Sequence, residues 1–120
     1  MLFRRRPQTV SEAPSFSHKA AKIWSQAEYE EFLDFIAENP QTGDLIEGTG
    51  GARKIRWTRP GMGKRGGTRV ITYYYDENAP VYLLMLFAKN EQSDLNADDK
   101  KELAKVISAI KDRHKRRRLS

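Results

Sequence analysis

Residues 48–75 constrain the fold most, because two strand-like stretches there enclose a glycine-rich loop. The stretches are Ala52–Trp57 and residues 68–75, and the loop between them is residues 58–67. Consecutive strands joined in this way usually pair as antiparallel neighbours. This segment contains seven Lys or Arg residues and neither Asp nor Glu. The chain is therefore expected to build a sheet around a hairpin with a cationic surface.

Alternation along the two strands gathers basic residues on one surface. Side chains at every second position of a strand share a face, so Lys54 and Arg56 point the same way, and pairing of the strands brings Arg69 beside them. Tyr73 and Tyr75 share the face of Arg69. Cations with aromatic rings suit a nucleic-acid backbone with exposed bases. The alternative is an ordinary solvated strand face with glycine turns, although solvated faces normally mix charges.

Composition narrows the class of protein. The length of 120 residues fits one domain, and the net charge of +6 favours a polyanionic partner. The absence of cysteine excludes disulfides, thiolate zinc sites and cysteine nucleophiles. No apolar run approaches the roughly 18 residues of a membrane span, and no apolar stretch of the kind found in secretory signals follows the basic first residues. We expect a cytoplasmic protein that is not bound to membranes.

Capping signals predict three helices. Pro14 begins a helix that ends near residue 24, and Ser25 with Glu28 has the form of a capping box that opens a second helix. Asn96 with Asp99 opens the last helix. The residues expected to be buried are Phe16, Ala20 and Ile23 in the first helix, Tyr29, Phe32, Leu33 and Ile36 in the second, and Leu103, Val106, Ile107 and Ile110 in the third.

The remaining strands complete an α+β fold. Residues 8–13 supply a short edge strand, and the nearly continuous apolar run at 81–89 suits a central strand buried on both faces. The short connection at 76–80 places that strand antiparallel to the preceding one. We expect a small antiparallel sheet, made of an edge strand and a three-stranded meander, packed against two N-terminal helices and one C-terminal helix. The expected divisions are a flexible basic lead (1–7), a single domain (8–112) and a basic tail (113–120).

Several kinds of site are not expected. The glycines do not form a nucleotide-binding loop. Gly43 and Gly48 have the spacing of the two glycines in that motif, but Thr49 stands where the motif has Lys, and no helix follows them. His18 and His114 are far apart in sequence, and each is expected at the surface. Neither histidine nor carboxylate pairs have ligand spacing near the basic strands. We therefore expect neither a metal nor a cofactor.

The motifs resemble a known family. Residues 39–57, NPQTGDLIEGTGGARKIRW, are followed by GKRGGTRVITYYY and then by VYLLMLFAKNEQSDLN. This order closely resembles the RelE/HigB superfamily of bacterial toxin–antitoxin toxins, and the first run matches the hallmark of a HigB-like branch over a resemblance covering about residues 8–110. The resemblance implies a RelE-like fold and an mRNA endoribonuclease that acts in the ribosomal A site. It also implies a cognate antitoxin, often a helix-turn-helix HigA-like protein that carries the pair to promoter DNA.

The resemblance also implies site residues. Family members keep basic residues where Lys54, Arg56 and Arg69 stand, so the active surface is expected there, with Lys89 as a further basic residue near the end of the last strand. Some relatives use a tyrosine near the C-terminus, whereas residues 91–96 contain none. The residues expected to bind RNA are Arg53, Arg59, Lys64, Arg65, Tyr73 and Tyr75. Either tyrosine could instead be a packed core residue.

Metal-free RNA cleavage uses the 2′-hydroxyl to attack the adjacent phosphate. Clustered cations lower each other's proton affinity, so Lys54 beside Arg56 and Arg69 could serve as base. The arginines would stabilise the transition state, because their planar groups match phosphate oxygens. Such a site is expected to depend on the ribosome for geometry. The basic runs at 4–6 and 113–118 would attach to ribosomal RNA or act as solubility tails.

Two other functions are compatible with the same residues. One is a nucleic-acid-binding module without catalysis, since binding and cleaving a phosphate both use Lys and Arg. The other is a protein-interaction domain whose basic face binds an acidic partner.

Overall fold

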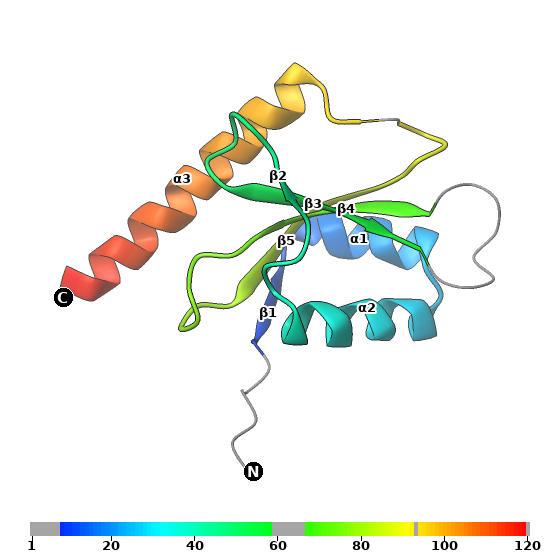
Figure 1. Ribbon diagram of the computed structural model, residues 1–120, viewed down its shortest axis with the longest axis horizontal. Coiled ribbons are helices and arrows are strands. Elements are labelled where there is room, and N and C mark those ends of the chain that lie inside the picture. The colour runs from blue at the N-terminus through cyan, green and yellow to red at the C-terminus, as the bar shows by residue number, and fades with distance from the viewer. Residues whose placement is uncertain (1–7, 59–66, 93, 120) are drawn as a thin grey trace, which may run out of the picture.

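A computed structural model describes residues 8–58, 67–92 and 94–119, in which three helices cover a five-stranded sheet (Figure 1). The elements are β1 (Val10–Glu12), α1 (Pro14–Ile23), α2 (Gln26–Glu38), β2 (Asp44–Leu45), β3 (Ala52–Trp57), β4 (Thr68–Tyr73), β5 (Val81–Ala88) and α3 (Ala97–Leu119). The strand order across the sheet is β1-β5-β4-β3-β2. Within the described residues, no helix combines the length and apolarity needed to span a membrane.

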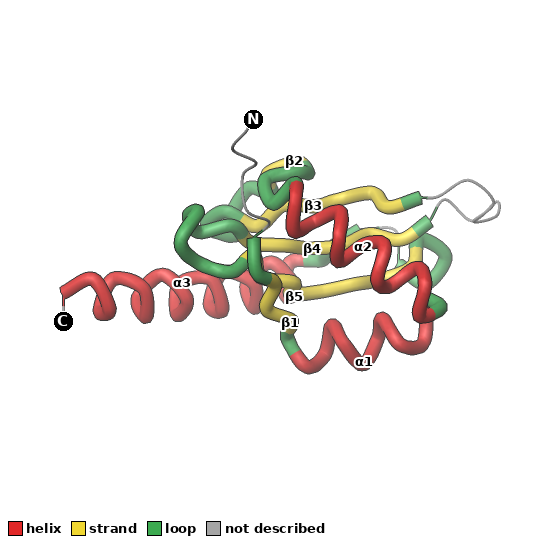
Figure 2. The backbone as a smooth tube through the Cα atoms, turned by 90° about the horizontal axis from the view of Figure 1, so that it is seen from below, coloured by secondary structure: helices red, strands yellow, loops and turns green. Residues whose placement is uncertain are grey.

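The sheet separates two hydrophobic cores. Helices α1 and α2 pack on one face and α3 packs on the other (Figures 1 and 2). The first core contains Phe16, Phe32 and Ile55, and the second contains Ile71 and Ile107. Each fully buried large apolar side chain contributes about 1.5–3 kcal/mol to folding. All six residues of β4 are buried, so the centre of the sheet is a firmly packed platform.

The α+β arrangement of two N-terminal helices, a meander and a C-terminal helix is confirmed. The expectation of a wholly antiparallel sheet is corrected, because β1 pairs parallel to β5, with Val10 opposite Val81. Strands that are separated by helices are free to pair in either direction. Strand β2 was not predicted, because two residues are too few to show a periodic pattern. Strand β4 ends at Tyr73 and β5 at Ala88, slightly earlier than expected.

The helix boundaries follow the capping signals. Ser25 and Glu28 form the predicted capping box of α2, and Asn96 and Asp99 exchange bonds of 2.8 and 3.1 Å at the start of α3. Helix α3 then continues through the basic run to Leu119.

One predicted core position in α3 is wrong, because Val106 is 37% exposed. Leu103, Ile107 and Ile110 form the buried stripe of the helix. Val106 precedes Ile107 by one position and so lies roughly 100° around the helix from it. The flank that carries Val106 therefore faces away from the sheet.

Candidate active site

Two predicted site residues lie directly opposite each other on the sheet. The antiparallel register of β3 and β4 pairs Arg56 with Arg69, and it pairs Lys54 with Ile71. Opposite positions in such a ladder have Cβ atoms about 4.5–5.5 Å apart. Ile71 belongs to the core beneath α3, so Lys54, Arg56 and Arg69 share the α3 side of the sheet. Arg56 is exposed, whereas Arg69 is only 8% exposed. We call these three residues the cationic face.

A carboxylate also reaches this face. Lys54 Nζ lies 3.1 Å from Asp94 Oδ1, and the same oxygen accepts a hydrogen bond of 2.8 Å from the Leu95 N–H. The Leu95 N–H, and after it the Lys54 ammonium, lower the pKa of Asp94 below its ordinary value. Asp94 is a functional candidate that the sequence prediction missed. It lies in the connection that leads from β5 to α3, and that connection has to reach the α3 side of the sheet.

Lys89 lies at the same end of the sheet as Arg69. It follows β5 directly, is exposed, and donates its N–H to the Gly67 carbonyl at 3.3 Å. Phe87, two residues earlier, pairs with Arg69. Lys89 therefore lies near the cationic face.

The Arg53 side chain makes a hydrogen bond within the protein. Its guanidinium donates to the Gly43 carbonyl at 3.1 Å. This bond ties β3 to the segment before β2 and uses only one of the N–H donors of the guanidinium, so the expected phosphate contact remains compatible with it. The other expected phosphate contacts, Arg59, Lys64 and Arg65, lie outside the described residues.

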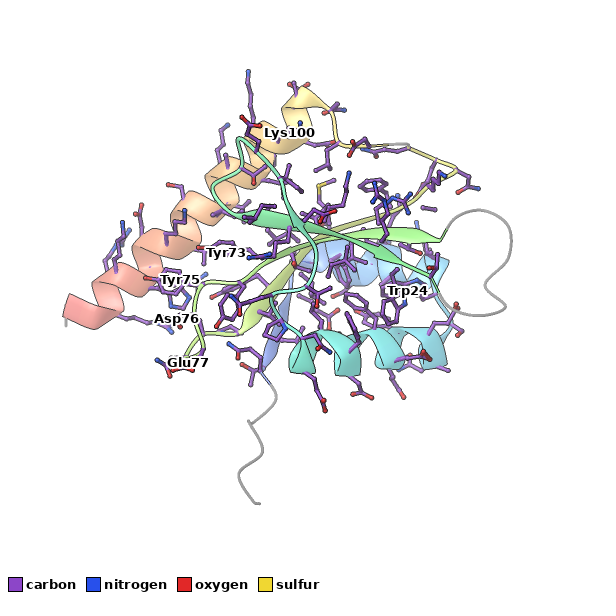
Figure 3. The ribbon with its side chains drawn as sticks, viewed as in Figure 1. Trp24, Tyr73, Tyr75, Asp76, Glu77 and Lys100 are labelled. Carbon is purple, nitrogen blue, oxygen red and sulfur yellow. The ribbon has the colours of Figure 1, made fainter. Side chains whose placement is uncertain are left out.

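The two candidate tyrosines lie away from the cationic face. Tyr73 is 5% exposed and stacks on Tyr82 with ring centroids 6.3 Å apart. Burial, followed by the neighbouring tyrosines, raises the pKa of Tyr73. Tyr73 stands four residues beyond Arg69 along β4, a span of roughly 13 Å. Figure 3 shows Tyr73 and Tyr75 along α3, so the packing alternative describes both rings best.

The position of Tyr75 is explained by its packing against His114 of α3. The two rings stack with centroids 4.5 Å apart, and the Tyr82 hydroxyl lies 2.7 Å from His114 Nε2. The expectation that His114 is a surface residue is therefore corrected, because its ring is half-buried between two tyrosines. His18 is exposed on α1, as expected.

The glycine-rich segment between α2 and β3, residues 40–51, is explained by packing. Gly43 has φ of +107°, and a Cβ there would lie 2.8 Å from the Lys54 carbonyl oxygen. Thr49 is fully buried, and its hydroxyl bonds backbone groups on both sides of the turn. The Gly50 carbonyl accepts a bond of 2.7 Å from Lys111 Nζ on α3. The segment between α2 and β3 thus holds β3 against α3 and fixes the backbone that carries Lys54.

The charged groups that the described residues bring to this site are mainly cations. Among them, no group of three or more His, Asp or Glu side chains could hold a metal ion. Two guanidinium groups and an ammonium lie on one side of the sheet, with a single carboxylate bonded to the ammonium. Such an arrangement can bind a phosphodiester and stabilise added negative charge on it.

A comparison with protein families finds one match that covers most of the chain. A family model described as the RelE toxin of the RelE / RelB toxin-antitoxin system matches residues 17–119. The match runs from within α1 to the last residue of α3 and includes the cationic face and Asp94.

Proposed function

The chain belongs to the RelE toxin family and is the toxin of a toxin–antitoxin pair, and from this premise we propose that it is an mRNA endoribonuclease. We place it in the HigB-like branch and propose that it cuts translated message in the ribosomal A site, in the cytoplasm. The observation that supports this proposal most strongly is the direct pairing of Arg56 with Arg69 beside Lys54. Two arginines so placed can hold the oxygens of one phosphate, as their planar groups are suited to do.

The proposed reaction needs no metal. The 2′-oxygen of the message attacks the adjacent phosphorus, the bond from phosphorus to O5′ breaks, and a 2′,3′-cyclic phosphate and a 5′-hydroxyl form. Arg56 and Arg69 stabilise the extra charge on the phosphate oxygens. The ion pair with Asp94 uses the ammonium form of Lys54, whereas a base would have to be the neutral amine. We therefore assign Lys54 the proton donated to O5′, while the 2′-hydroxyl proton passes to solvent.

Two binding partners, ribosomal RNA and an antitoxin, extend the proposal. Beyond Ile110, helix α3 carries exposed basic side chains at Arg113, Lys115 and Arg116. We propose that these contact ribosomal RNA through its phosphates, independently of sequence. The antitoxin is proposed to be a helix-turn-helix HigA-like protein, through which alone the pair binds DNA. An adjacent reading frame that encodes such a protein would support this pairing.

The test compares message ends in cells that produce the chain alone. The wild type and Lys22→Ala, which removes an exposed cation from the opposite face, should arrest growth and produce new 5′ ends inside translated frames. Arg56→Ala should produce neither, although its exposed position lets the protein fold normally. Cuts that persist in Arg56→Ala would contradict the proposed site. Ribosome association without any cuts from folded wild-type protein would favour the nucleic-acid-binding module.

A further inference from the structure

The pair formed by Lys54 and Asp94 is asymmetric in exposure. The Lys54 side chain is 18% exposed, whereas that of Asp94 is 61% exposed. The carboxylate therefore lies on the solvent side of the ammonium that it binds. A phosphate that approaches Lys54 from solvent meets the negative charge of Asp94 at the same place.

Asp94 is held by its own segment. Its carboxylate oxygen accepts the Leu95 N–H at 2.8 Å, and Leu95 is 8% exposed in the core beneath α3. Gln92 Nε2 donates to the Asp94 carbonyl at 2.8 Å and to Asp99 at 3.0 Å. These bonds hold the Asp94 carboxylate in place. It can therefore fix the end of the long Lys54 side chain, which would otherwise sample many rotamers.

We propose that Asp94 is a positioning residue, which holds the Lys54 ammonium for proton donation to O5′ and opposes RNA binding through its charge. This inference rests on the proposed function. It follows from two effects of one carboxylate. A fixed ammonium lowers the entropy lost on reaching the reactive geometry, whereas a negative charge beside an incoming phosphate weakens binding. Loss of Asp94 should therefore change affinity and cleavage rate in opposite directions.

The same connection contains a matched control. Glu91 forms an ion pair of 3.1 Å with Lys19, which belongs to α1 on the other side of the sheet. Glu91→Gln and Asp94→Asn each remove one negative charge from a partly exposed ion pair in this segment. An effect of overall charge would appear in both variants, whereas an effect on Lys54 would appear only in Asp94→Asn.

The experiment is single-turnover cleavage on ribosomes programmed with a defined message, over a range of toxin concentrations. Asp94→Asn should lower the rate at saturation by about tenfold or more and lower the half-saturating concentration about two- to fivefold. Its amide oxygen can still accept the Leu95 N–H, so the fold should be kept. Glu91→Gln should match the wild type in both quantities. Equal effects in both variants, or a wild-type rate for Asp94→Asn, would overturn the inference.

A second measurement separates this inference from the proposed function. The Lys54 ammonium, when bonded to Asp94, should give a slowly exchanging ¹⁵N resonance. It should exchange faster in Asp94→Asn, because a neutral amide oxygen binds an ammonium more weakly than a carboxylate does, and it should be kept in Glu91→Gln. A wild-type chain that never cleaves message would overturn the proposed function, and the resonance would still report whether Asp94 holds Lys54. A Lys54 resonance unchanged in Asp94→Asn would overturn the positioning role.

Discussion

Arg56 and Arg69 are paired directly across the β3–β4 ladder, so two cations occupy opposite positions on neighbouring strands. Like charges in this relationship destabilise a sheet. Departures from the pattern that would be most stable concentrate at functional sites. The pairing therefore supports the proposed role of this surface in binding a phosphate.

Replacing Arg56 with Thr should separate stability from activity. Threonine suits a strand, and its introduction removes the repulsion across the ladder, so the free energy of unfolding should stay level or rise by about 0.5 kcal/mol. Message cleavage should be lost. Urea unfolding and mapping of message ends measure the two effects. A loss of more than about 1 kcal/mol would show that Arg56 has a structural role instead.

Two glycines on either side of β2, Gly43 and Gly48, should respond differently to alanine. Gly43 and Gly48 both have positive φ, but only at Gly43 would a Cβ collide with the backbone, at 2.8 Å from the Lys54 carbonyl oxygen. Gly48→Ala meets nothing within 4 Å and should cost about 1 kcal/mol from backbone strain alone. Gly43→Ala should cost about 2–4 kcal/mol. Thermal unfolding of the two variants compares them, and equal losses would contradict the close approach at Gly43.

Local signals in the sequence predicted most of the fold. The capping pairs that open α2 and α3 act over three residues, and strand alternation acts over two. For the same reason, alternation correctly placed Lys54, Arg56 and Arg69 on one face, since the register of a hairpin follows from its own residues.

Contacts between distant segments could not be read from such patterns. Asp94 reaches Lys54 from 40 residues away, and their meeting depends on the path between β5 and α3. His114 likewise depends on where the last helix crosses the ends of the strands, so its contact with Tyr75 was missed. Strand parity alone placed Tyr73 near RNA, whereas the packing of α3 buries it.

Tyr29 should give the fold a dependence on alkaline pH. Its hydroxyl bonds Glu12, and burial, followed by that bond, raises the pKa of Tyr29 above its ordinary value. A raised pKa in the folded state means that the stabilisation is complete below about pH 10, the unfolded value, and is lost as the pH rises through the folded pKa. Tyr29→Phe should lower stability by about 1 kcal/mol at neutral pH and reduce the loss above pH 10. Urea unfolding from pH 7 to 11 tests this, and parallel curves would contradict it.

His114 should hold the C-terminal turns of α3 to the sheet. Among the α3 side chains that the structure describes, Ile110 is the last large apolar one in the buried stripe, and His114 adds a stacked ring and a hydroxyl contact beyond it. His114→Ala should therefore cost about 1 kcal/mol and speed amide exchange in the turns after Ile110, while the turns around Leu103 stay protected. Lys115→Ala, at an exposed neighbouring position, should leave exchange unchanged. Uniform exchange along α3 in His114→Ala would show that the helix opens as one unit and that the ring contact anchors all of it.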